Sequence, residues 1–194
     1  MKQQRTLLEL NVTAPSFELI DVFDRNIDLK AYRGKKVLVG FFRHAGCPFC
    51  NLRIHLLQKH SEAWKALGLE LIFFFESGKS TLLRSIFHKE VSPIPLISDP
   101  EKIWYTSYGI EESLSKSRAS HLTSFIQTAI KAKITGVPLH LMAENEAFGT
   151  MPAEFLLDTN QIIRKIHYSK GLTDRMSIDY IYDFAKGDER GVLR

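Results

Sequence analysis

Two residues of this chain are well suited to covalent chemistry, Cys47 and Cys50, and they are its only cysteines. They form a Cys-Pro-Phe-Cys segment, so two residues separate the sulfurs. A thiolate at this spacing can attack a substrate disulfide, and the second thiol can then release the substrate by closing an internal disulfide. We therefore predict Cys47 as the nucleophile and Cys50 as the resolving thiol.

The same spacing also occurs in zinc sites and in inert buried pairs. A structural zinc ion usually needs four protein ligands. The sequence has no second Cys-x-x-Cys, and only His55 and His60 form a histidine pair with a suitable offset. A redox dithiol without metal or cofactor is the preferred interpretation, and an inert buried pair stays as the alternative.

The elements around the motif are those that a reactive cysteine needs. Residues 37–42 form an apolar run that predicts a strand buried on both faces. Gly46 breaks this run, and a helix is predicted from the motif to about Leu67, closed by Gly68. Pro48 suits the first helical turn, because its missing N–H would be unpaired there. Cys47 is then expected at the start of the helix with its side chain facing solvent, and Cys50 one turn further on.

The start of a helix favours the ionised form of a thiol. The partial positive charge of the helix N-terminus stabilises a thiolate over a thiol. Arg43 and His44 lie close to Cys47 in the sequence and could lower its pKa further. The alternative for both is that they are solvated loop residues.

Composition bounds the class of protein. The chain has 194 residues and a formal charge of +4, with lysine and arginine scattered along it. We predict one domain over residues 1–194, with a core from about 14 to 187, and no nucleic-acid partner. The first ten residues lack a continuous apolar stretch, and no run is long enough to cross a membrane. A cytoplasmic protein without a signal peptide is therefore expected.

The remaining pattern is that of an α/β protein. A strand over residues 69–75 follows the helix, and the order strand–helix–strand predicts parallel pairing. Other predicted elements are a hairpin in 16–29, a short strand near 96, strands at 153–157 and 162–168, and a helix at 174–186. Residues 111–149 interrupt the pattern as a mostly helical insertion. The apolar face of this insertion could pack on the sheet or form a homodimer contact; it comprises Leu122, Phe125, Ile126, Ala129 and Ile130.

Several short motifs in this order resemble one family. They are Ala14-Pro15 with Phe17, Leu19 and Asp21; Tyr32 and Gly34-Lys35 before the apolar run; Ser98-Asp99-Pro100 with Tyr108-Gly109; and Pro152 to Asp158 with Ile162-Ile163-Arg164. Together they resemble the thioredoxin-fold redoxins. More narrowly, the chain is similar to the alkyl hydroperoxide reductase/thiol-specific antioxidant family and its peroxiredoxin-like branch.

The resemblance implies a thioredoxin-like three-layer sandwich. In this fold a central mixed β-sheet is flanked by helices, and the N-terminal hairpin is an extension. The resemblance also implies that Met151-Pro152 is the cis-proline that faces the dithiol in thioredoxin-fold proteins. The backbone of Met151 would then pair with an extended segment of the substrate.

The sequence departs from peroxiredoxins at the residues that handle peroxide. Peroxiredoxins carry Pro-x-x-x-Thr-x-x-Cys and a later arginine. With Cys50 as the reactive sulfur, Cys47 stands at the threonine place and Arg43 at the proline place; with Cys47 as the reactive sulfur, neither place fits either. The later arginine falls on Pro152. This pattern predicts the loss of the hydrogen bonds that polarise a bound peroxide.

Three functions therefore stand at this point. The leading prediction is a thiol–disulfide oxidoreductase that acts on protein or small-molecule disulfides and takes electrons from a thiol donor such as the thioredoxin or glutathione system. The first alternative is a thiol-dependent peroxidase with Cys50 as the internal resolving thiol. The second is a non-enzymatic binding module that keeps the fold and uses the insertion as an interaction surface.

Overall fold

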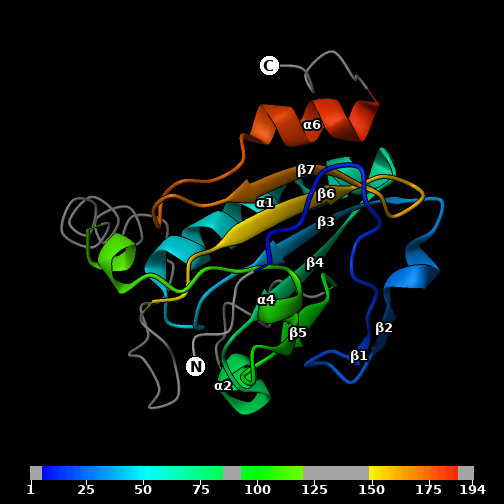
Figure 1. The fold of residues 1–194 in the computed structure, drawn as a ribbon. Helices are drawn as coiled ribbons and strands as arrows, with labels where there is room; N and C mark the ends of the chain where they lie inside the picture. Colours follow the sequence, from blue (N-terminus) through cyan, green and yellow to red (C-terminus); the bar gives the residue numbers. More distant parts are fainter. Residues whose placement is uncertain (1–5, 85–92, 120–148, 188–194) are drawn as a thin grey trace.

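A five-stranded mixed sheet forms the centre of the protein (Figure 1). The structure is a computed structural model that describes residues 6–84, 93–119 and 149–187. Across the sheet the strands are β5 (Leu96–Ser98), β4 (Leu69–Phe75), β3 (Lys36–Phe41), β6 (Ala153–Leu157) and β7 (Ile163–Tyr168). The first three run parallel, and β6 is antiparallel to both β3 and β7. The predicted mixed sheet is confirmed.

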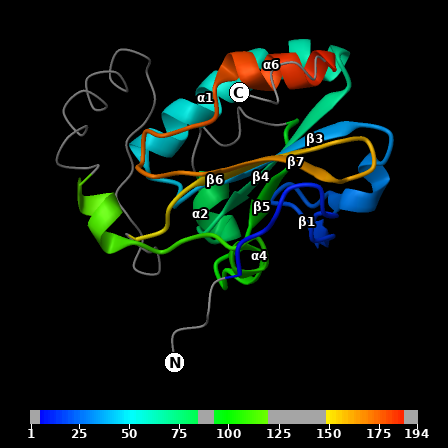
Figure 2. The same cartoon turned by 45° about the horizontal axis from the view of Figure 1, so that its top comes forward.

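The central strand β3 is buried on both faces, as its unbroken apolar sequence predicts. Alternate side chains enter two separate clusters: Leu38 packs on the side of α1 (Pro48–Ala66) and α6 (Ile178–Lys186), and Val39 packs on the side of α4 (Ile103–Ser107). Figure 2 shows α1 and α6 on one side of the sheet and α4 on the other. The three layers expected of the thioredoxin-like sandwich are therefore present.

The N-terminal hairpin forms a second, small sheet. Strands β1 (Glu18–Ile20) and β2 (Asn26–Asp28) pair antiparallel and lead into the short helix η1 (Leu29–Tyr32). Asp24 adopts φ 62° in the turn, a conformation that short polar side chains tolerate. This extension was predicted from the sequence.

Helix ends follow local capping chemistry. Helix α1 ends at Ala66, and Gly68 follows at φ 78°, as predicted. Helix α6 starts four residues later than Asp174, because the Ser177 side chain accepts the N–H of Tyr180 and caps the helix there. The short α2 (Lys79–Arg84) follows β4. Among the described residues, no helix is long and apolar enough to cross a membrane.

Only the edges of the 111–149 insertion fall within the described residues. Residues 114–119 are helical, and Glu112 forms an antiparallel bridge with Thr150. The predicted apolar face, Leu122 to Ile130, lies outside the described residues.

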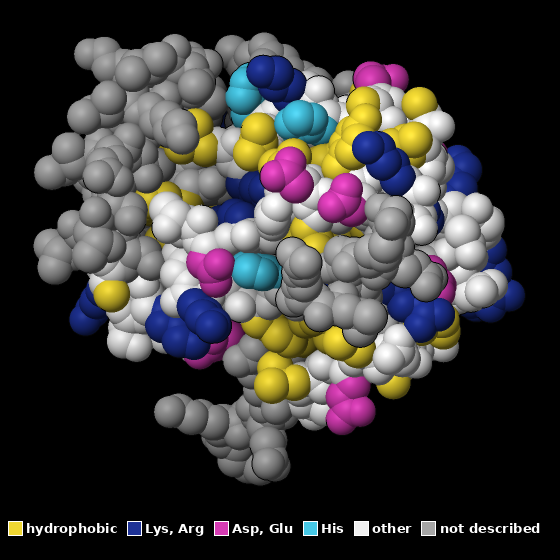
Figure 3. All heavy atoms as spheres, turned by 90° about the horizontal axis from the view of Figure 1, so that it is seen from above, with side chains coloured by type: hydrophobic (Ala, Val, Ile, Leu, Met, Phe, Trp, Pro, Cys, Tyr) yellow, Lys and Arg dark blue, Asp and Glu magenta, His cyan; other side chains and the backbone are white. Residues whose placement is uncertain are grey.

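On the face seen from above in Figure 3, acidic and basic side chains are interspersed and do not gather into one patch of either sign.

Candidate dithiol active site

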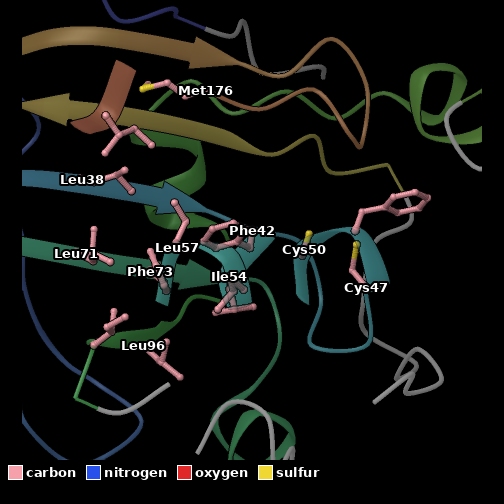
Figure 4. Packing of buried hydrophobic residues seen from close by; sticks show 14 of the residues in the cluster. Leu38, Phe42, Cys47, Cys50, Ile54, Leu57, Leu71, Phe73, Leu96 and Met176 are labelled. Carbon is pink, nitrogen blue, oxygen red and sulfur yellow. The ribbon is translucent and has the colours of Figure 1, made fainter. Parts of the chain in front are cut away.

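Both cysteines lie near the start of α1, just after the loop that connects it to β3. Cys47 is the residue that caps α1, with φ −71° and ψ 111°, and Pro48 occupies the first helical position. Its carbonyl accepts the N–H of Asn51 at 3.0 Å, the first hydrogen bond of the helix. Cys50 follows one turn later, and the two thiols are not joined. Figure 4 shows their sulfurs at one end of the apolar cluster that contains Phe42 and Ile54.

The prediction that Cys47 faces solvent is wrong. Cys47 and Cys50 both have 0% of their surface exposed. The loop before α1 is held down on both sides: Ala45 N–H donates to Ser77 Oγ at 2.7 Å, and Asn51 Nδ2 donates to the Ala45 carbonyl at 3.0 Å. These bonds keep the loop against the end of β4, so the cysteine that follows it packs into the core.

Arg43 places a positive charge beside the sulfur of Cys47. Its side chain is fully buried, and its Nη1 lies 3.6 Å from Cys47 Sγ. Its backbone N–H also donates to Cys50 Sγ at 3.4 Å. The view of Arg43 as a solvated loop residue is therefore wrong, because one residue contacts both sulfurs.

The pKa values of the two thiols are shifted in opposite directions. Burial raises the pKa of Cys47, but a hydrogen bond from the Cys50 thiol and the positive charges of Arg43 and Arg175 outweigh it, and the pKa falls to about 6. Burial and the neighbouring Cys47 sulfur raise the pKa of Cys50 well above its usual range. Both shifts favour a thiolate on Cys47 and a thiol on Cys50.

His44 is also buried, at 4% exposure, so it too is not a solvated loop residue. It meets the motif through its backbone, because its carbonyl accepts the N–H of Cys47 at 3.0 Å. A contribution of its imidazole to the acidity of Cys47 stays a prediction.

Arg175 is a site residue that sequence reasoning missed. It lies between β7 and α6, and its Nη1 donates to the carbonyl of Asp174 at 2.8 Å and to Ser169 Oγ at 3.2 Å. Its positive charge lowers the pKa of both cysteines, against the effect of their burial. No motif near Arg175 marks it, because it reaches the dithiol only through the fold.

The predictions for Met151 and Pro152 need correction. The described residues contain no cis peptide bond, so Met151-Pro152 is trans, the form that X-Pro bonds prefer unless the structure imposes the other. The Met151 N–H already donates to the Glu111 carbonyl at 2.8 Å. Met151 does pack in the same apolar cluster as both cysteines, but the chain itself occupies the place where a substrate strand was expected to pair.

The charge of Arg43 also acts on a buried carboxyl, that of Glu76. Glu76 Oε2 accepts a hydrogen bond from Thr150 Oγ1 at 2.6 Å and lies 3.2 Å from Lys102 Nζ. Burial raises the pKa of Glu76, while Thr150, Lys102 and Arg43 oppose the rise. The Arg43 charge therefore favours the ionised form of both Glu76 and Cys47.

Comparisons with known proteins agree with this architecture. The thiol peroxidase from Chromobacterium violaceum superimposes with a TM-score of 0.63 at 18% identity, over 95% of this chain and 90% of that one. Peroxidoxin BcpB from Mycobacterium tuberculosis gives 0.62 at 14% identity, over 96% and 99% of the two chains. At these identities the likeness shows the fold.

Sequence relatives narrow the assignment. The putative peroxiredoxins bcp of Buchnera aphidicola and Haemophilus influenzae are 29% and 28% identical over 105 and 103 residues, which is 54% and 53% of this chain. Each match spans 66% of the relative's own length. The family model described as AhpC/TSA family matches residues 10–166, most of the chain. The chain therefore belongs to the AhpC/TSA family.

Proposed function

We propose that this chain is a thiol-dependent peroxidase in which Cys47 reacts with the peroxide and Cys50 resolves the product. The Cys47 thiolate attacks one peroxide oxygen, the O–O bond breaks, and the leaving alkoxide or hydroxide takes a proton. Cys47 is then a sulfenic acid, and the peroxide is reduced to an alcohol or water. Cys50 attacks the sulfenic sulfur, water leaves, and a disulfide forms. Two electrons from an external thiol return the pair to the reduced state.

One observation carries this proposal: a cysteine with a pKa of about 6 whose side chain has no exposed surface. The low pKa supplies the nucleophile at neutral pH. The burial selects the substrate, since a small hydroperoxide needs far less space to reach the sulfur than a protein disulfide does. Arg43, 3.6 Å from the sulfur, also places a guanidinium where an oxyanion develops.

The backbone around Met151 argues against exchange with protein disulfides. An extended substrate needs a backbone N–H to pair with, and the one on Met151 is bonded to Glu111. Residues 111–113 form this contact together with a 2.6 Å bond from Ser113 N–H to the Gly149 carbonyl. The dithiol at a helix start still favours thiol–disulfide exchange as the second candidate, with small-molecule disulfides as its substrates.

The decisive experiment is a stopped-flow reaction of the reduced protein with hydrogen peroxide and with an organic hydroperoxide. We expect a rate constant far above that of free cysteine, and one internal disulfide per peroxide consumed. Cys50→Ser should keep the first reaction and leave a sulfenic acid that a trapping reagent captures, while Cys47→Ser should lose both steps. A wild-type rate equal to that of free cysteine, together with fast reduction of a small disulfide, would favour the second candidate.

A further inference from the structure

The peptide bond between Phe42 and Arg43 connects α4, on one side of the sheet, with α1, on the other, at the dithiol. The carbonyl of Phe42 accepts the hydroxyl hydrogen of Tyr105 at 2.5 Å, and the N–H of the next residue, Arg43, donates to Cys50 Sγ at 3.4 Å. A peptide unit is planar, and in its trans form the C=O and N–H point in opposite directions. Any rotation of this unit therefore disturbs both hydrogen bonds together.

We propose that Tyr105 is a positioning residue for the resolving thiol: its hydroxyl holds the Phe42–Arg43 peptide so that the Arg43 N–H points at Cys50 Sγ. This inference rests on the proposed function for its role in turnover. The contact itself is independent of which electrophile oxidises Cys47.

The Tyr105 hydroxyl is itself firmly placed. Tyr105 is 3% exposed, and its ring meets the Phe41 ring edge-to-face with centroids 5.2 Å apart. Its helix, α4, begins at the carboxylate of Asp99, which accepts the N–H groups of Ile103 at 3.0 Å and Trp104 at 2.8 Å. Asp99 in turn donates its own N–H to the Phe75 carbonyl at 2.8 Å, so α4 is anchored to β4.

The resolving step needs such a contact. Cys50 must lose its proton to attack the sulfenic acid on Cys47, and burial and the neighbouring sulfur both oppose its ionisation. A backbone N–H directed at the sulfur stabilises the thiolate. A hydroxyl that donates to the carbonyl of the same peptide polarises it and strengthens its N–H as a donor. Tyr105 thus acts on Cys50 through the Phe42–Arg43 peptide.

A second tyrosine provides a matched control. Tyr108 is fully buried in the same layer, its ring lies 4.8 Å from that of Phe41, and its hydroxyl donates to the Pro15 carbonyl at 2.8 Å. Replacing either tyrosine by phenylalanine removes one hydroxyl from one backbone carbonyl, that of Phe42 or that of Pro15. Only the Tyr105 change reaches the peptide that contacts Cys50.

The experiment compares Tyr105→Phe with Tyr108→Phe after a single pulse of hydrogen peroxide. Formation of the sulfenic acid should proceed at the wild-type rate in both. Closure of the disulfide should slow about threefold to tenfold in Tyr105→Phe, the range that one hydrogen bond supplies, and stay within about twofold in Tyr108→Phe. Equal closure rates in the two variants would overturn the proposal. If Tyr105→Phe does not fold, Asp99→Asn, which loosens the start of α4, should slow closure in the same direction.

A second measurement does not depend on peroxide. In the Cys47→Ser background, the rate at which Cys50 is alkylated can be followed against pH for each tyrosine variant, because the thiolate is the form that reacts. We expect Cys50 to ionise at higher pH in Tyr105→Phe than in Tyr108→Phe, and identical titrations would contradict the role of Tyr105. A wild-type protein that reacts no faster than free cysteine with peroxide would sink the peroxidase proposal, and this titration would still decide the role of Tyr105.

Discussion

Two buried arginines near the start of α1 illustrate two uses of the same side chain. Arg53 is held by short bonds, with its Nε 2.7 Å from Glu154 Oε1 and its Nη2 2.8 Å from Glu154 Oε2. Arg43 has its Nη1 3.6 Å from the sulfur of Cys47. The charge of Arg53 is neutralised by the carboxylate of Glu154 in a bidentate pair. The charge of Arg43 lies beside a thiol, which carries a negative charge only after it has lost its proton. The comparison teaches that the partner decides whether a buried cation supports the architecture or tunes a reactive group.

The Arg53 pair also organises the site at a distance. Arg53 Nη2 donates to the Met176 carbonyl at 2.8 Å, and the Met176 N–H donates to Glu154 Oε2 at 3.1 Å. These bonds join α1, β6 and the segment that leads into α6. Arg175 precedes Met176, so the pair fixes where the second positive charge lies relative to Cys47.

The largest effect should come from breaking this pair. Arg53→Met leaves the carboxylate of Glu154 buried without its cation, and we expect the free energy of unfolding to fall by about 3–5 kcal/mol. Urea denaturation followed by circular dichroism measures the loss. The double variant Arg53→Met/Glu154→Leu should recover much of it, because no isolated charge then remains in the core.

An exposed pair serves as the control for this prediction. Lys35 Nζ lies 2.8 Å from Glu70 Oε1, with the lysine side chain 54% exposed. Lys35→Met should change the stability by less than about 1 kcal/mol. If Arg53→Met proved as mild as this surface change, the structural role given to the buried pair would be wrong.

The next effect should come from Arg43 and appear in reactivity. Arg43→Met removes the guanidinium beside Cys47, so the pKa of that thiol should rise from about 6. Because the thiolate is the reactive form, the wild-type rate should climb as pH rises through this value and then level off, and the variant should climb at higher pH. At neutral pH the variant should react about tenfold more slowly, since only a small fraction of an ordinary thiol is ionised there.

Peroxide consumption or alkylation of Cys47, measured across the pH range, tests this expectation. The two alkylation curves should converge at alkaline pH, where Cys47 is fully ionised in both proteins, whereas the peroxide reaction of Arg43→Met should stay slower because the guanidinium that stabilises the oxyanion is missing. Arg43→Lys keeps a positive charge but loses the planar fork, so its curve should lie between them. Superimposed curves for wild type and Arg43→Met would show that the helix start, Cys50 and Arg175 set the acidity of Cys47 without Arg43.

The sequence was sufficient for the frame of the site because that information is local. The apolar run of β3, Pro48 in the first turn of α1 and Gly68 after its end each act on neighbouring residues, and all three were predicted. The N-terminal hairpin and the late strands β6 and β7 were predicted in the same way.

What the sequence missed depends on contacts between distant segments. The burial of Cys47 follows from a bond between Ala45 and Ser77, which no local pattern announces. A charged residue inside a strand, such as Glu154, gives no sign that its partner lies 101 residues away on α1. The expectation of a cis bond at Pro152 came from the resemblance, and the bond from Met151 to Glu111 that occupies this place could be found only in the fold.

The smallest effect should separate the two arginines that act on the dithiol. Arg43 lowers the pKa of Cys47 more than Arg175 does, whereas Arg175 lowers that of Cys50 more than Arg43 does. Arg175→Gln should therefore slow disulfide closure by about twofold, as expected for a screened charge, and leave the first reaction with peroxide nearly unchanged. Arg43→Met should act mainly on that first reaction. Stopped-flow traces with two phases resolve sulfenic acid formation from disulfide closure. If both substitutions slowed the same step, the two arginines would act on the same sulfur, and the separate roles given to them would be wrong.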